Sequence, residues 1–105
     1  YIKDDINFCQ HYAYISGNYY FIHDEGSVYK YVAFVKSGNR IKRNVLAKNS
    51  LDSKKLSLQG SNILLEKCDD FNLNVNGNFV DIEILYNGKT YKESIALRVK
   101  EYEKE

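Results

Sequence analysis

The hydrophobic period of the sequence changes near Tyr19, which limits the chain to a short helical part followed by a longer β part. Before that point, four residues recur at steps of four, three and four, the spacing of one face of an α-helix. They are Ile2, Ile6, Cys9 and Ala13. We predict a helix tail over residues 1–16 that packs on a sheet through these four side chains. Because no N-cap residue precedes the pattern, we interpret it as the end of a longer helix.

From residue 19 onward, β-branched and aromatic residues cluster between polar turns, which is typical of strands. Seven strands are predicted, at 19–23, 28–35, 40–47, 63–68, 71–75, 79–86 and 91–99. Both faces of 28–35 are largely apolar, which predicts a central strand covered on both sides. Residues 49–61 are mainly polar and are predicted to form a long connection between two groups of strands.

Two Asn-Gly dipeptides, at 76–77 and 87–88, predict two-residue hairpin loops. Such loops fix the register of the strands that they join, and register decides which side chains share a face. The predicted pairs are Leu73 with Val80 across the first loop, and Ile84 with Tyr91 and Glu83 with Lys92 across the second. Both hairpins then place apolar residues on the same face of their shared strand, which predicts a three-stranded meander.

These features predict an α+β fold in a single globular head domain over residues 1–105. The helix tail packs on antiparallel sheet of about seven strands, and the β region covers 19–100. The charged tail at 101–105 is expected to fray.

The balance of charge excludes recruitment of a partner by a global electrostatic field. Fifteen basic and fourteen acidic residues give a formal net charge of +1. A small basic patch is conceivable from Arg40, Lys42, Arg43, Lys54 and Lys55. Solvated surface charge is the default for such residues, so we expect no nucleic-acid partner.

The sequence contains no known catalytic motif, and its only histidines are His11 and His23. Four neighbouring residues carry oxygen ligands that calcium could use, namely Asp69, Asp70, Asn72 and Asn74. Their spacing lacks the glycine and the closing glutamate of an EF-hand, and outward positions of an amphipathic strand explain them more simply. We therefore expect no enzyme activity, no metal, no cofactor and no small-molecule substrate.

Two cysteines, Cys9 and Cys68, allow at most one disulfide, and their spacing has no zinc-site form. A bridge is compatible with an exported domain, whereas two buried thiols are the alternative. The residues alone leave both open.

Six tyrosines gather in the first third of the chain, and aromatic surfaces can stack sugars or bases. They are Tyr12, Tyr14, Tyr19, Tyr20, Tyr29 and Tyr31. The alternative function is therefore a small exported β domain that binds carbohydrate or single-stranded nucleic acid. It requires a concave face with at least three exposed tyrosines beside basic residues.

Four segments, in this order, resemble the type IV pilin-like proteins, and among them the minor pilins and minor pseudopilins of the J/W type. They are the helix tail at 2–6, the hairpin at 37–43 that ends in an apolar-x-Arg step, the segment 63–71 and the closing strand 94–98. The chain opens on Tyr1 and contains no Met, so we expect a processed or excised form with the family's anchoring helix upstream.

The resemblance implies a non-catalytic structural subunit that helps to initiate or cap fibre assembly at the tip. Its partners would be other minor and major pilin-like subunits, and the missing N-terminal helix would be its only membrane contact. It would lie at the cell surface, and in the inner or plasma membrane before assembly. A pilus, a secretion pseudopilus and a DNA-uptake apparatus all remain open.

The same resemblance assigns roles to the two sides of the predicted helix. One side packs on the sheet, and a Cys9 to Cys68 bridge would tie the two together. The other side is predicted to face neighbouring subunits through Lys3, Asp4, Asn7 and Phe8.

Overall fold

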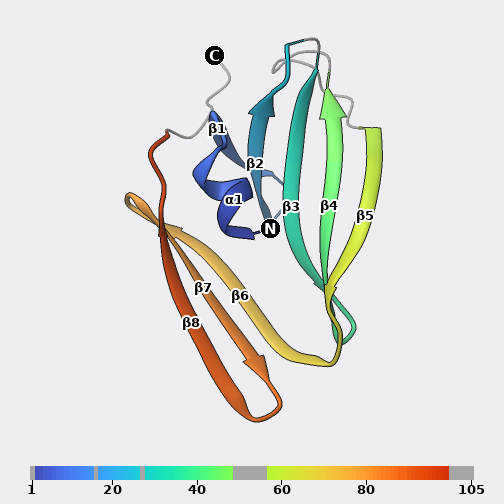
Figure 1. Ribbon diagram of the computed structural model, residues 1–105, viewed down its shortest axis with the longest axis vertical. Coiled ribbons are helices and arrows are strands. Elements are labelled where there is room, and N and C mark those ends of the chain that lie inside the picture. The colour runs from blue at the N-terminus through green and yellow to red at the C-terminus, as the bar shows by residue number, and fades with distance from the viewer. Residues whose placement is uncertain (1, 16, 27, 49–56, 100–105) are drawn as a thin grey trace.

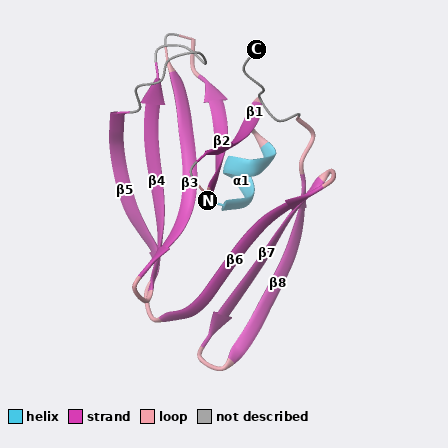
Figure 2. Cartoon of the chain, turned by 180° about the vertical axis from the view of Figure 1, so that it is seen from behind, coloured by secondary structure: helices cyan, strands magenta, loops and turns pink. Residues whose placement is uncertain are grey.

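A computed structural model describes residues 2–15, 17–26, 28–48 and 57–99 of the chain. Within them the protein is almost entirely β, with one short helix, α1, at Ile2–Asn7 (Figures 1 and 2). The strands are β1 His11–Ile15, β2 Asn18–Asp24, β3 Tyr29–Ser37, β4 Arg40–Lys48, β5 Ser57–Leu65, β6 Cys68–Asn76, β7 Phe79–Tyr86 and β8 Lys89–Ala96.

The strands form two antiparallel sheets in chain order. Sheet A has the order β1-β2-β3-β4-β5, and sheet B has the order β6-β7-β8. A connection of two residues joins sheet A to sheet B, and the second of them, Lys67, has a φ of 58°. The amide of Cys68 then donates to the carbonyl of Asn39, with an N–O distance of 2.7 Å, which fixes this corner against the β3–β4 turn.

Helix α1 lies in the space between the two sheets (Figure 1). The main core is built there from α1, the inner face of sheet A, the inner face of sheet B and the segment that follows β8. Its buried members are Ile6, Cys9, Phe21, Val32, Phe34, Val80, Ile82, Ile95 and Leu97. The two sheets therefore share one hydrophobic core.

Strand β3 occupies the centre of sheet A, as predicted for 28–35. Four consecutive side chains, from Tyr31 to Phe34, are buried, so both faces of the strand are covered. A second cluster of Ala13, Ile22 and Tyr31 lies on the face of sheet A that is turned away from α1. The prediction of a central strand covered on both sides is confirmed.

The predicted α+β fold with a helix tail over residues 1–16 is wrong. The helix ends at Asn7, and His11–Ile15 instead pairs with β2 as an edge strand, with Ala13 opposite Tyr20. The segment from Tyr12 to Ile15 alternates aromatic with aliphatic residues, and aromatic and β-branched residues favour strands over helices. Ala13 lies four residues after Cys9, so its position fits the spacing of a helix face as well as the period of two of a strand.

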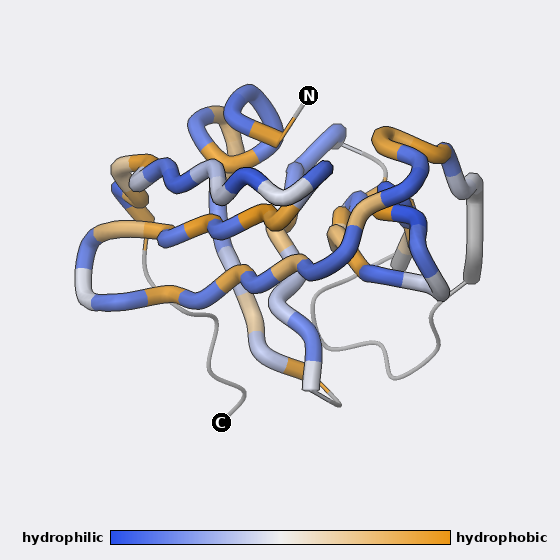
Figure 3. Tube along the Cα trace, turned by 90° about the horizontal axis from the view of Figure 1, so that it is seen from below, coloured by the Kyte–Doolittle hydropathy of each residue, from blue (hydrophilic) through white to orange (hydrophobic). Residues whose placement is uncertain are grey.

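The predicted hairpin at 87–88 is confirmed, including the pairs Ile84 with Tyr91 and Glu83 with Lys92. The loop predicted at 76–77 lies one residue later, so that Leu73 pairs with Ile82. Figure 3 shows the resulting alternation of polar and apolar residues along the strands.

The physical reason for the shift is the conformation of Gly77, which has φ 58° and occupies the first central position of the loop. A type II′ turn requires glycine there, and Gly77-Asn78 meets that requirement. The predicted loop, Asn76-Gly77, would have suited a type I′ turn equally well. Because the register moved by two residues, every side chain kept its predicted face.

Strand β5 begins at Ser57, so the connection predicted at 49–61 is partly strand. The rest of that connection, and the charged tail predicted at 101–105, lie outside the described residues.

Candidate functional site

Helix α1 is held against the core by its apolar side. Ile6 is only 1% exposed and Cys9 is buried beside it, while Ile2 packs against the same cluster half-buried. Of these residues, Ile2 and Ile6 belong to α1, whereas Cys9 follows the end of the helix and is buried in the same core. Ala13, the fourth predicted residue, belongs to β1 and to the cluster on the opposite face of sheet A. The predicted role of Ala13 in helix packing is therefore corrected.

An ion pair ties α1 to sheet A. Arg43 of β4 donates from Nε to Oδ2 of Asp5 at 2.7 Å and from Nη2 to Oδ1 at 3.0 Å. The two side chains are only 22% and 13% exposed, respectively. A two-point contact between guanidinium and carboxylate fixes orientation as well as distance. Sequence reasoning missed this pair, because 38 residues separate its members.

The chain that leaves α1 is fixed to strand β2. The amide of Gln10 donates to the carbonyl of Ile22 at 2.9 Å, and its side-chain oxygen accepts from the amide of Asp24 at 2.9 Å. The helix is thus held both at its core-facing side and just beyond its C-terminal end.

Both cysteines are free thiols, and each donates to a nearby main-chain carbonyl. The Sγ of Cys9 lies 3.1 Å from the carbonyl oxygen of Ile6, and that of Cys68 lies 2.9 Å from the carbonyl oxygen of Asp70. Burial raises the pKa of Cys9 to about 11, an effect that its backbone hydrogen bond partly offsets. A thiol with such a pKa is a poor nucleophile at neutral pH, so Cys9 acts as a small core residue.

The opposite side of α1 faces solvent. The residues that the resemblance assigned to a subunit interface, Lys3, Asp4, Asn7 and Phe8, are all exposed. Phe8 is 69% exposed, which is unusual for so large an apolar side chain beside a well-packed core. We call these four residues the α1 surface.

A groove of about 430 Å³ adjoins the α1 surface, between the start of the helix and the hairpin of β7 and β8. Ile2 and Lys3 line it on the helix side, and Ile84 and Tyr91 line it on the sheet side. Tyr91 is 52% exposed. The predicted pairing of Ile84 with Tyr91 across the 87–88 loop was a sequence signal that could have identified this groove.

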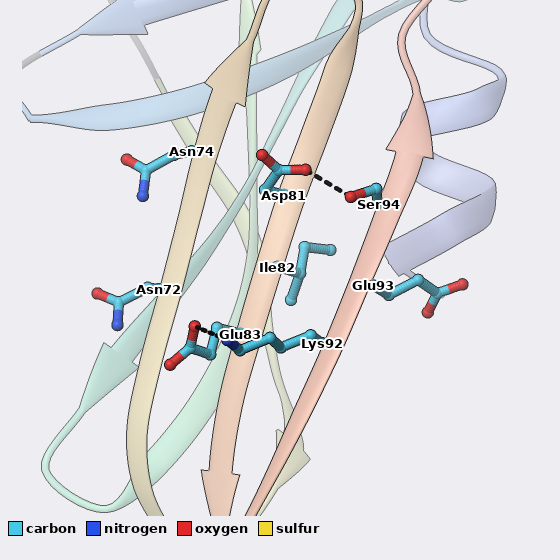
Figure 4. Close-up of a pocket in the computed structure, with 8 residues that line it drawn as sticks. All are labelled: Asn72, Asn74, Asp81, Ile82, Glu83, Lys92, Glu93 and Ser94. Carbon is cyan, nitrogen blue, oxygen red and sulfur yellow. Dashed lines mark hydrogen bonds and ion pairs between the residues drawn. The ribbon is translucent and has the colours of Figure 1, made fainter.

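A second, polar hollow of about 400 Å³ lies on the outer face of sheet B (Figure 4). In its centre, Asp81 accepts hydrogen bonds from Oγ of Ser94 and Nδ2 of Asn76, each at 2.6 Å. These bonds, that of Ser94 foremost, lower the pKa of Asp81. The carboxylate is therefore ionised and satisfied, and lacks the raised pKa that helps a carboxyl group act as a general base near neutral pH.

The residues considered as calcium ligands lie exposed along β6. Asp70 uses one carboxylate oxygen to accept from the amide of Phe71 at 2.9 Å. Within the described parts of the chain, no three His, Cys, Asp or Glu residues are grouped so that they could hold a metal ion.

The tyrosines of the alternative function are divided between the two faces of sheet A. Tyr14 and Tyr19 are in contact on the inner face, with ring centroids 4.7 Å apart and ring planes tilted by 56°, and Tyr20 and Tyr31 lie on the outer face. Of the six, only Tyr14 is exposed, at 54%. Arg43, from the basic patch considered above, is engaged with Asp5, and Lys54 and Lys55 lie outside the described residues. The required face with three exposed tyrosines is not found in the described structure.

No family model, no curated protein and no solved structure matches the chain. Among the described residues, no helix has the length and apolar character needed to cross a membrane.

Proposed function

We propose that this chain is the head of a non-catalytic structural subunit of a type IV pilus or a related pseudopilus. In this role it binds neighbouring pilin-like subunits through the α1 surface and helps to initiate or cap the fibre at its tip. The observation that carries the proposal is the position of α1, which is fixed between two sheets with one side buried and the other exposed.

A helix of six residues is not stable alone in water, because too few hydrogen bonds offset the cost of starting it. Here Ile6 and the pair of Asp5 with Arg43 hold it in place. Its exposed residues are therefore ordered before any partner arrives, which lowers the entropy cost of binding.

The composition of the α1 surface suits a protein partner. Phe8 offers an exposed aromatic anchor, and Lys3 and Asp4 supply charges of both signs around it. An apolar centre with a polar rim is the usual arrangement of a protein interface. The adjoining groove beside Tyr91 extends the apolar area onto sheet B.

In this proposal the membrane anchor is a helix N-terminal to Tyr1, and the subunit lies in the inner or plasma membrane before it joins the fibre at the cell surface. A pilus, a secretion pseudopilus and a DNA-uptake apparatus would use such a head in the same way.

Site-specific cross-linking tests the proposal in the cells that make the protein. A photo-reactive amino acid in place of Phe8 should give cross-links to other pilin-like subunits, identified by mass spectrometry. The matched control is the same substitution at Ile63 of β5, which is also exposed but lies on sheet A's far edge. Cross-links that are absent at position 8, or equal at the two positions, would contradict the proposal.

A further inference from the structure

Strand β6 forms one edge of sheet B, and its residues 71–76 are a regular, uncharged stretch of that edge. The other edges are protected in the ways that natural proteins use. Strand β8 carries Lys89, Lys92 and Glu93, β5 is interrupted by two register shifts, and β1 has only five residues. Residues 71–76 have no charge, proline, glycine or register shift.

Alternate residues of β6 direct their main-chain groups away from β7. The two-residue loop makes Asn76 and Phe79 the closing hydrogen-bonded pair, so Asn72 and Asn74 also bond to β7. Leu73 and Val75 then turn their N–H and C=O groups toward the free edge. The amide of Phe71 fits this alternation, because it donates to its neighbour's side chain instead of to β7.

Among the residues that the structure describes, the outward main-chain groups of Leu73 and Val75 are unpaired. Within the described parts of the chain, no hydrogen bond to Leu73 or Val75 is found beyond the pairing with β7. An unpaired row of donors and acceptors at a spacing of two residues is complementary to one kind of ligand, an extended main chain.

A groove of about 300 Å³ runs along this edge. One wall is β6 from Phe71 to Asn74, and the other is the inner face of sheet A, including Tyr14, Tyr19 and Phe34. The amides of Asn72 and Asn74 stand beside the edge, on the side of β6 that faces away from β7 (Figure 4).

Burial of the inner face of sheet B decreases toward the groove. On β7, Val80 and Ile82 are buried, whereas their partners on β6, Val75 and Leu73, are only half-buried. An added strand would cover this remaining apolar surface with every second side chain.

We propose that the edge of β6 binds an extended segment of another polypeptide as an additional antiparallel strand of sheet B. The segment carries apolar side chains at alternate positions, and these enter the groove beside Tyr14 and Leu73. The opposite wall of the groove belongs to the same molecule, so we expect a single strand to pair with this edge, and not the sheet of a second folded copy. The proposal does not depend on the pilin-like function.

The test uses isotope-labelled protein and a capped synthetic peptide, acetyl-Lys-Val-Thr-Val-Thr-Val-Lys-amide, followed by NMR and hydrogen exchange. The expected result is movement of the Leu73 and Val75 amide signals and slowing of their exchange by about tenfold at about 1 mM peptide. The amides of β5 and β8 are internal controls that should not respond.

Two modified peptides distinguish strand addition from other binding. In an antiparallel pair, the peptide residues that bond to Leu73 and Val75 are those whose side chains point into the groove. N-methylation of the valines should therefore abolish binding, and N-methylation of the threonines should leave it intact. Equal binding of the two peptides, no response at about 1 mM, or a response at β5 or β8 would overturn the proposal.

A matched pair of protein variants tests the groove itself. Tyr14→Ala should weaken peptide binding by about tenfold, because an aromatic anchor is lost. Phe79→Ala removes an equally exposed ring outside the groove and should leave binding unchanged. If Phe79→Ala weakened peptide binding more than Tyr14→Ala does, the proposal would also be overturned.

Discussion

Arg43 of β4 holds Asp5 of α1 by two hydrogen-bonded contacts, at 2.7 and 3.0 Å, in a half-buried position between helix and sheet. The pair joins the first helical turn to the second half of sheet A. It therefore determines how the exposed side of α1 is oriented with respect to the rest of the molecule.

Removing one member of this pair should destabilise the protein. Asp5→Ala leaves the guanidinium of Arg43 partly buried without its carboxylate, so the free energy of unfolding should fall by about 1–3 kcal/mol. Urea unfolding measures the change. The control is Glu25→Ala, which breaks the exposed pair of Lys30 with Glu25 and should cost less than about 1 kcal/mol. Equal effects of the two substitutions would show that the half-buried pair of Asp5 with Arg43 does not fix α1.

The two sides of α1 should respond differently to truncation. Ile6→Ala empties a fully buried site and should lower the free energy of unfolding by about 2–5 kcal/mol. Phe8→Ala removes a larger side chain from an exposed site and should change stability by less than about 0.5 kcal/mol. The same urea titrations measure both. A larger loss from Phe8→Ala than from Ile6→Ala would be inconsistent with the described orientation of the helix.

Stability should depend on pH through Asp81. Its pKa in the folded state lies below the ordinary value of 3.8. The ionised carboxylate therefore stabilises the folded state at pH values above 3.8, and this contribution is lost as the pH falls through the lowered pKa. Asp81→Asn should therefore reduce the decline in stability of the native chain below about pH 4. Thermal unfolding from neutral to acid pH measures this. Parallel curves for the two proteins would mean that Ser94 and Asn76 do not stabilise the carboxylate.

Cys9 should produce a loss of stability at alkaline pH. Its pKa rises from 9.0 to about 11 on folding, so the unfolded chain releases the thiol proton first and is favoured as pH increases across that interval. Replacing the thiol by Cys9→Ala should remove this part of the decline, while other groups titrate alike in both proteins. Unfolding measured at pH 8 and at about pH 11 gives the comparison. An identical decline in the variant would contradict the burial of the thiol.

The hairpins were the most predictable part of the fold, because each needs only a local backbone conformation. Asn87-Gly88 allowed a single solution, and the observed φ of 52° and 74° suits a type I′ turn. Asn76-Gly77-Asn78 allowed two solutions that place the same side chains inside. The hydrophobic pattern therefore could not choose between them.

The helix was predicted poorly because its limits are set by tertiary contacts. Residues 11–15 fit a helical and a strand period equally, and pairing with β2 decides the outcome. Of the candidate interface, the exposed side of α1 followed from the spacing of Ile2 and Ile6. The pair of Asp5 with Arg43 could not be predicted, because its members are far apart in the sequence. For the groove beside Tyr91, the pairing of Ile84 with Tyr91 was predicted, but the approach of Ile2 and Lys3 depends on how the two sheets enclose the helix.

The central claim is that the chain is the head of a pilin-like subunit, and the reading frame upstream of the Tyr1 codon tests it most directly. The account predicts a short basic leader, a cleavage-site glycine and a continuous apolar helix of about 20 residues that runs into Ile2. A conventional signal peptide, or another folded domain joined at this point, would contradict it.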